Sequence, residues 1–153
     1  MSTSLVFNQQ LPVAIGADHA GYEYKELLKS MLETSGWSVL DKGTHSLDSV
    51  DYPDFAHPVA AAVEQGLASF GVLICGSGEG VCITANKHAG VRAALCWNND
   101  VAQLSRQHNN ANVICMPARF VSVELAKEML QSFIQTAFEG GRHENRVQKI
   151  TCG

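Results

Sequence analysis

The chain has 153 residues, of which 46% are apolar and 17% are charged, and its net charge is −4 at neutral pH. This size suits one domain with a buried core, and the composition is unlike that of a disordered chain. The negative charge argues against a nucleic-acid-binding protein. No segment is apolar enough to cross a membrane, and the first ten residues lack the basic and apolar parts of a signal peptide. We therefore expect a cytoplasmic protein in which residues 1–10 form a loose leader.

Apolar runs alternate with segments of helical periodicity. We predict strands at 12–17, 37–41, 70–75, 91–96 and 112–116, and helices at 22–34, 53–65, 98–108 and 121–138, with a helical start at 81–88. This alternation predicts an α/β fold, a single doubly wound (Rossmann-like) five-stranded parallel sheet with helices on both faces. Residues 11–139 form that domain, and 140–153 form a C-terminal extension that carries a short polar helix or tail.

The most informative segment follows the third predicted strand and reads Cys75-Gly-Ser-Gly-Glu-Gly80. A thiol that faces the start of a helix lies among free N–H groups, which favour the thiolate and stabilise bound anions. Glycine lets the backbone approach a ligand closely. A lone cysteine is more often structural, but the glycine-rich turn favours a nucleophile or base beside an anion-binding loop.

Several familiar motifs are excluded in this segment. A dinucleotide fingerprint needs glycine and a thiol phosphatase loop needs arginine where Val81 stands, and the Gly-Lys-Ser/Thr ending of a Walker A loop is absent. A phosphoacceptor receiver domain would carry aspartate in place of Cys75. The five cysteines include no C-x-x-C pair, so we expect reduced thiols rather than a disulfide framework.

Other polar residues follow the predicted strands, and ligands of such sheets bind beyond the strands' carboxyl ends. Asp18 and His19 follow the first strand, although Asp18 equally suits a helix N-cap. Arg119 follows the last strand, and Arg142 and Arg146 would share one helical face. Guanidinium groups match phosphate oxygens, so these arginines are candidate phosphate ligands. The histidines show no metal-ligand spacing, and we expect no metal site.

In chain order the motifs resemble those of the type B ribose-5-phosphate isomerase family, which includes galactose-6-phosphate isomerase subunits. The matching segments are residues 16–21, 41–44, 51–53, 74–80, 85–87, 102–109 and 140–147. The resemblance implies an aldose–ketose isomerase that interconverts ribose 5-phosphate and ribulose 5-phosphate through an enediolate. Such chemistry needs a base, an acid at the carbonyl and a stabilised oxyanion, but no metal or organic cofactor.

The resemblance also implies residue roles. Cys75 is the base that moves a proton between C1 and C2, Ser77 assists on the substrate oxygens, and His108 opens the furanose ring. Taken without the resemblance, His108 equally suits a basic helix end. Family members with a glutamate base carry it where Val81 stands here, so the cysteine version applies. The substrate-binding residues that it implies are Asp18, His19, Tyr52, Gly76, Gly78, Glu79, Gly80, Asn109, Arg119, Arg142 and Arg146, with His19 and the three arginines on the phosphate.

The family also shares each site between two subunits, with His108 of one facing Cys75 of the other. A homodimer, or a tetramer of two such dimers, is therefore implied. Three alternatives remain open. The substrate could be a 6-phosphohexose, allose or galactose 6-phosphate, although this chain holds the whole residue set that the galactose enzymes divide between two chains. The chain could be a non-catalytic phosphate- or nucleotide-binding module on the same fold, or a redox enzyme that acts through Cys75.

Overall fold

The structure is a computed structural model, and it describes residues 6–151. Within this range five strands form one parallel sheet in the order β2-β1-β3-β5-β4. The strands are β1 (Val13–Ala17), β2 (Val39–Asp41), β3 (Phe70–Cys75), β4 (Ala93–Leu95) and β5 (Val113–Pro117). The predicted fold class is confirmed.

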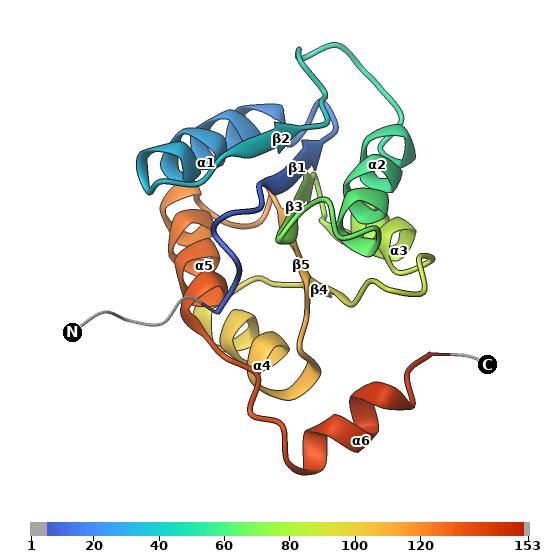
Figure 1. The fold of residues 1–153 in the computed structure, drawn as a ribbon. Helices are drawn as coiled ribbons and strands as arrows, with labels where there is room; N and C mark the ends of the chain where they lie inside the picture. The colour runs from blue at the N-terminus through green and yellow to red at the C-terminus, as the bar shows by residue number, and fades with distance from the viewer. Residues whose placement is uncertain (1–5, 152–153) are drawn as a thin grey trace.

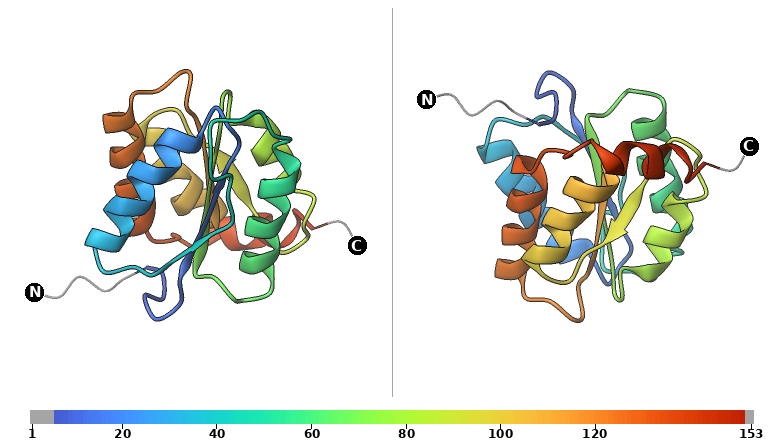
Figure 2. Two further views of the ribbon diagram at one scale, coloured as in Figure 1. Left: turned by 90° about the horizontal axis from the view of Figure 1, so that it is seen from above. Right: turned by 90° about the horizontal axis from the view of Figure 1, so that it is seen from below.

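Helices cover both faces of the sheet (Figure 1). The described residues form α1 (Tyr22–Thr34), α2 (Pro53–Glu64), α3 (Glu79–Ala85), α4 (Asn99–Asn109), α5 (Val123–Gln135) and α6 (Arg142–Gln148). The helices α1, α4 and α5 lie on one face, α2 and α3 lie on the other, and α6 lies beside the β4 edge (Figure 2). No helix among residues 6–151 has the length and apolarity needed to cross a membrane.

Alternation along β3 decides which way the thiol points. Phe70, Val72 and Ile74 pack in the cluster beneath α1 and α5, whereas Leu73 and Cys75 belong to the cluster beneath α2 and α3. Successive strand side chains point to opposite faces, and both faces are covered, so the strand is apolar throughout. Cys75 therefore ends the strand on the side where the following loop turns into α3.

Several element boundaries differ from the predicted ones. The edge strands β2 and β4 are shorter than predicted. Trp37 and Val91, which suggested longer strands, are buried but do not belong to the ladder of hydrogen bonds. Helix α3 begins at Glu79, inside the glycine-rich segment. Helix α5 begins after Ser122, whose hydroxyl accepts a hydrogen bond from the Leu125 N–H at 3.1 Å. Apolar runs report burial, and burial alone does not fix hydrogen-bond pairing.

Residues 6–10 differ from the predicted loose leader. Phe7 is buried, and its ring lies 4.6 Å from the Phe70 ring and 5.5 Å from the Phe133 ring, centroid to centroid. The Gln9 amide donates a hydrogen bond to the Ser35 carbonyl at 3.1 Å. Burial of one aromatic side chain supplies enough free energy to hold a short polar segment in place. Residues 1–5, the rest of the predicted leader, lie outside the described residues.

Candidate active site

The centre of the candidate site lies where β1 and β3 end side by side. The chain leaves β1 toward β2 on one side and later returns to form β3 on the other, which makes this the topological switch point where such sheets bind ligands. Asp18, just after β1, donates its backbone N–H to the Ile74 carbonyl at 3.3 Å. A Cβ added to Gly21 would lie 2.5 Å from the same carbonyl oxygen. Asp18 and Cys75 are thus held at one rim.

The loop after Cys75 folds back onto the thiol. The Gly78 N–H donates a hydrogen bond to Cys75 Sγ at 3.2 Å, and the Glu79 N–H donates one to Ser77 Oγ at 3.2 Å. Gly78 has a φ of +73°, and a Cβ there would lie 2.6 Å from Leu95 Cδ1. Glycine is therefore required at this position both for its backbone angle and for space. This hydrogen bond holds the sulfur against the turn of the loop.

Two large side chains lie against glycines of this loop. A Cβ added to Gly80 would come within 2.6 Å of the Tyr52 ring, and one added to Gly76 would lie 3.1 Å from Arg119 Nε. The Arg119 N–H also donates to the Gly76 carbonyl at 3.0 Å. The absence of side chains thus lets a phenol and a guanidinium approach the backbone beside Cys75.

Asp18 and His19 order the neighbouring loops. Asp18 is buried, and its Oδ1 accepts hydrogen bonds from the N–H groups of Ala20 and Gly21 at 3.0 and 3.1 Å. The N-cap of α1 is Gly21, so the interpretation of Asp18 as a helix cap is wrong, and its carboxylate instead holds the turn before the helix. His19 Nδ1 accepts the Val50 N–H at 3.2 Å, which fixes the long loop before α2 against the rim.

A hollow opens beside the loop. Its volume is about 320 Å³, and it is lined by Ser77, Glu79, Leu95, Trp97, Pro117 and Phe120. The two aromatic side chains of this lining are exposed, Trp97 at 54% and Phe120 at 77%. The loop therefore faces a half-open, partly apolar space.

The remaining predicted residues lie elsewhere in the chain. His108 and Asn109 end α4, and Arg142 and Arg146 are exposed on α6, which contacts α4. Cys75 pairs with the last residue of β5, whereas α4 leads into the first residue of that strand. A five-residue strand spans about 13 Å. The predicted site residues thus form two groups at opposite ends of the sheet.

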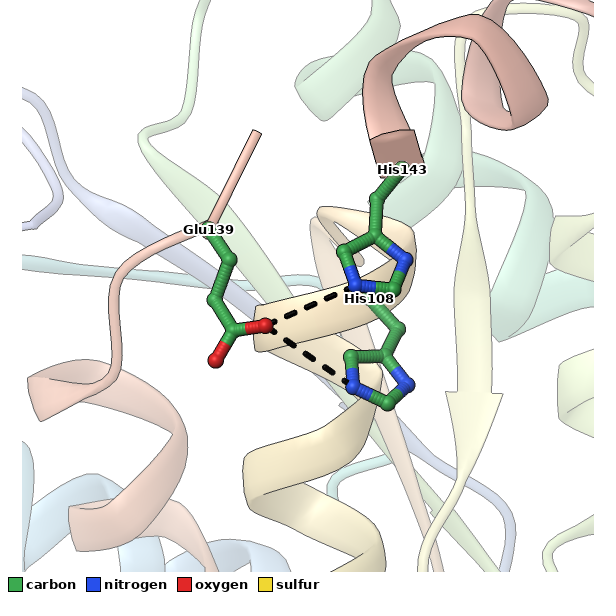
Figure 3. A group of neighbouring side chains, drawn as sticks. All are labelled: His108, Glu139 and His143. Carbon is green, nitrogen blue, oxygen red and sulfur yellow. Dashed lines mark ion pairs between the residues drawn. The ribbon is translucent and has the colours of Figure 1, made fainter. Parts of the chain in front are cut away.

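His108 has two neighbours to which the sequence assigned no role (Figure 3). Its Nε2 lies 3.9 Å from Glu139 Oε1, the His143 Nε2 lies 3.5 Å from the same oxygen, and the two rings stack with centroids 4.2 Å apart. His143 is buried. Burial and the charges of His108, Arg142 and Arg146 lower its pKa below the usual value, while Glu139 opposes that shift.

The sequence spacing could have suggested a contact between Glu139 and His143, but not the contact of either residue with His108. Glu139 and His143 are four residues apart across a glycine pair, and His108 lies far away in the sequence. Within residues 6–151, this cluster is also the one group of three His, Cys, Asp or Glu side chains whose ligand atoms converge, all within 4.8 Å of one another. No motif that is local in sequence contains all three residues.

Comparisons with known proteins decide the family. Residues 13–150 match the family model described as Ribose/Galactose Isomerase. The chain belongs to this family. Ribose-5-phosphate isomerase B of Escherichia coli (strain K12) is 46% identical over 140 residues, which cover 92% of this chain and 94% of that protein. D-erythrulose-4-phosphate isomerase of Pectobacterium atrosepticum is 41% identical over 144 residues, which cover 92% of this chain and 93% of that protein.

A solved structure of the ribose/galactose isomerase family shares the whole fold. Ribose-5-phosphate isomerase B of Mycoplasma genitalium with bound ribulose 5-phosphate is 41% identical and has a TM-score of 0.90, covering 94% of this chain and 95% of that chain. The chain is therefore an enzyme of this family, a sugar-phosphate isomerase.

The other described cysteines of this family member differ from Cys75 in their surroundings. Burial raises the pKa of Cys96 to about 12 and that of Cys115 well above its usual value. A hydrogen bond from Cys115 lowers the pKa of Cys82 against the effect of burial, but the Cys82 thiol points at the Ala93 carbonyl, 3.4 Å away. Among the described thiols, Cys75 is the one whose sulfur accepts a hydrogen bond from the glycine-rich loop.

Proposed function

We propose that this isomerase interconverts ribose 5-phosphate and ribulose 5-phosphate through an enediolate, with Cys75 as the base. The observation that carries the proposal is the 3.2 Å hydrogen bond from the Gly78 N–H to Cys75 Sγ at the topological switch point of the sheet. This contact holds the sulfur at the loop, and Asp18, Tyr52 and Arg119 lie around the same loop. The names of the compared relatives support sugar-phosphate substrates of this size.

Each part of the reaction has a candidate group. The Cys75 thiolate takes the proton from C2 and returns it to C1, and the Ser77 hydroxyl assists transfer between the sugar oxygens. The loop from Gly76 to Gly80 and the side chain of Glu79 face the sugar. Loop N–H groups other than those of Gly78 and Glu79, which bond to Cys75 Sγ and Ser77 Oγ, stabilise the enediolate oxygen. The phosphate anchors the substrate through a group that does not react. Its proposed ligands are His19, Arg119, Arg142 and Arg146.

The two separated groups support a site shared by two chains. His108, Asn109, Arg142 and Arg146 lie at the opposite end of the sheet from Cys75, so one chain does not bring the ring-opening histidine to the thiol. A homodimer in which each copy places its α4–α6 end over the other's glycine-rich loop would complete two identical sites. The exposed Trp97 and Phe120 beside the loop are apolar surface that such a partner would cover. Two such dimers could pair into a tetramer.

The function is tested with a panel of sugar phosphates in deuterated water. The panel contains ribose 5-phosphate, allose 6-phosphate, galactose 6-phosphate and erythrose 4-phosphate. We expect the highest kcat/KM for ribose 5-phosphate, with solvent deuterium at C1 of the ketose and, after reversal, at C2 of the aldose. A clear preference for a hexose phosphate would move the assignment to that sugar. No solvent deuterium even after many reversals of the reaction would contradict an enediolate whose proton exchanges with water, and binding without turnover would identify a non-catalytic module.

The shared site predicts that two inactive variants restore each other. A heterodimer of the Cys75→Ala and His108→Ala chains has one site with both groups intact and one with neither. A mixture unfolded and refolded together should therefore regain about a quarter of wild-type activity, since half of its dimers are mixed and half of their sites are intact. Refolding Cys75→Ala with the double variant Cys75→Ala/His108→Ala is the control and should regain nothing. Mixed dimers seen by native mass spectrometry without activity would contradict the shared site.

We also place the protein in the cytoplasm. Cys75, Cys82, Cys96 and Cys115 are free thiols, and three of them are buried. Unpaired thiols persist in the reducing environment of the cytoplasm, where disulfides are rare.

A further inference from the structure

Glu139 and His143 occupy a position that the proposed chemistry leaves without a function. The Glu139 carboxylate reaches both imidazoles through one oxygen, 3.9 Å from His108 Nε2 and 3.5 Å from His143 Nε2 (Figure 3). The side chains of Glu139 and His108 are 52% and 41% exposed, whereas that of His143 is 9% exposed. A buried ring thus supports an exposed ring, and a carboxylate lies against the edge of both.

The backbone holds Glu139 over the end of α4. Its N–H donates a hydrogen bond to the Gln107 carbonyl at 3.0 Å. The next two residues, Gly140 and Gly141, have φ values of +66° and +54°, and a Cβ at either would meet nothing within 4 Å. Glycine is needed there for the direction of the chain and not for space. The turn brings His143 back, and its N–H bonds to the Gly140 carbonyl at 3.0 Å.

A buried arginine ties this segment to the same helix. Arg106 Nε donates to the Thr136 carbonyl at 3.0 Å, and Nη1 donates to Asn110 Oδ1 at 2.9 Å and to the Ala111 carbonyl. The chain from α5 to Glu139 is therefore fixed relative to the last turn of α4. Glu139 and His108 therefore lie on two segments, the chain after α5 and the end of α4, that hydrogen bonds hold in a fixed arrangement.

The same three side chains are poorly arranged for a metal ion. The His108 and His143 rings are inclined by only 14° and stacked. A metal must lie about 2.0–2.1 Å from each imidazole nitrogen and close to each ring plane, along the lone pair. Two stacked, nearly parallel planes do not meet at such a point. The arrangement instead suits a carboxylate at ion-pair distance from the two Nε2 atoms, which would stabilise an imidazolium formed there.

We propose that Glu139 is a positioning residue for His108, and that its carboxylate and the stacked His143 ring hold His108 as the acid that opens the furanose ring. The proposal rests on the proposed function, in which His108 performs that step. The bond between C1 and the ring oxygen breaks, its electron pair stays on the ring oxygen, and that oxygen takes the proton of the His108 imidazolium. The C1 hydroxyl proton leaves to water, which yields the aldehyde, and water later reprotonates His108.

The neutral state of His143 fits this arrangement. Its lowered pKa keeps the buried ring uncharged near neutral pH. The Glu139 carboxylate then serves the one ring that acts as the acid in the proposed step, that of His108. A carboxylate beside an imidazole that orients the ring and stabilises the imidazolium is a known element of acid–base catalysis.

Two reactions of one substrate pair separate ring opening from proton transfer. Ribose 5-phosphate is cyclic and must be opened before it reacts. In ribulose 5-phosphate the C5 oxygen carries the phosphate and cannot close a furanose ring on the C2 carbonyl, so exchange of its C1 hydrogen with deuterated water needs the base but no ring opening. Glu139→Gln should lower kcat for ribose 5-phosphate by about 10- to 100-fold, part of the effect of a general acid, and leave the exchange rate unchanged. Glu139→Asp should restore part of the loss.

The controls distinguish the possible failures. His108→Ala should lose the forward reaction at least as strongly and keep the exchange, and Cys75→Ala should lose both. Glu33→Gln, an exposed acid at the end of α1, should change neither. An unchanged forward rate in Glu139→Gln, or an equal loss of both reactions, overturns the positioning role. A wild-type enzyme that performs neither reaction overturns the proposed function instead.

Discussion

Replacing Cys75 with alanine should lower kcat for ribose 5-phosphate by about 10³-fold, within the range that a general base contributes, while the protein still binds the substrate. The physical reason is that removal of a carbon-bound proton requires a base beside C2, and the Cys75 thiol is placed for this at the rim. The hydrogen bond from the Gly78 N–H holds its sulfur in that position. Binding should persist because the phosphate ligands and the loop N–H groups are unchanged. Steady-state kinetics and calorimetric titration with ribose 5-phosphate measure the two quantities.

The chain offers a matched control for this substitution. Cys82 lies on α3, one turn beyond the loop, and its thiol points at the Ala93 carbonyl and the Asn86 amide. Cys82→Ala should therefore leave kcat within a few-fold of wild type. Cys75→Ser, which preserves the shape and the contact with Gly78, should fail like Cys75→Ala because a hydroxyl is a much weaker acid than a thiol. Full activity in either Cys75 variant would mean that another group, such as Glu79, is the base.

The fold could be predicted from the sequence because one pattern, an apolar strand followed by a helix, is repeated along the chain. Each central strand is an apolar run such as residues 70–75, buried on both faces, and each is followed by a helix. The edge strands gave a weaker signal: Val39–Asp41 and Ala93–Leu95 are only half buried. The anchoring of the leader by Phe7 depends on the distant Phe70 and Phe133, and no local pattern reports such a contact.

The site residues likewise fall into those that the sequence predicts to lie together and those that it does not. Asp18 and Arg119 follow strands and Cys75 ends one. The carboxyl ends of parallel strands meet at one rim, so the proximity of the three residues follows from the order of elements. His108 ends a helix that runs back to the other rim, and only a second chain would bring it to the thiol. The contact of His108 with Glu139 depends on the turn at Gly140 and Gly141. That contact is tertiary, and residue spacing does not reveal it.

A buried ion pair between α1 and the end of β2 lies next to the rim, and we expect its loss to lower the stability of the folded chain. Lys25 is fully buried in α1, with Nζ 2.6 Å from Asp41 Oδ2 and 2.7 Å from Glu26 Oε1. Asp41 ends β2, and its Oδ1 accepts the Gly43 N–H at 2.9 Å. The Ala17 N–H donates to the Gly43 carbonyl at 2.8 Å. The pair thus connects α1 and the turn after β2 to the residue that precedes Asp18.

Lys25→Met should lower the free energy of unfolding by about 1–3 kcal/mol, because the Asp41 carboxylate loses its nearest and buried partner and keeps only Lys29 and the Gly43 N–H. Urea denaturation at one fixed protein concentration measures this, since association would make stability depend on concentration. Lys29→Met is the control: Lys29 lies 3.2 Å from Asp41 but is partly exposed, and its loss should cost less than about 1 kcal/mol. Equal effects of the two substitutions would contradict a special role for the buried pair.

The pH dependence supplies an independent check on the same pair. Burial acts to raise the pKa of Asp41, but hydrogen bonds from Lys25 and Gly43 and the charge of Lys25 lower it below its ordinary value. A carboxyl whose pKa is lower in the folded state stabilises the protein above its unfolded pKa, and this contribution disappears as the pH falls through the folded pKa. Wild type should therefore lose stability below about pH 4. Lys25→Met should lose less there, so the difference in unfolding free energy between the two proteins should narrow as the solution is acidified; a constant difference would show that Asp41 is not the group through which Lys25 acts.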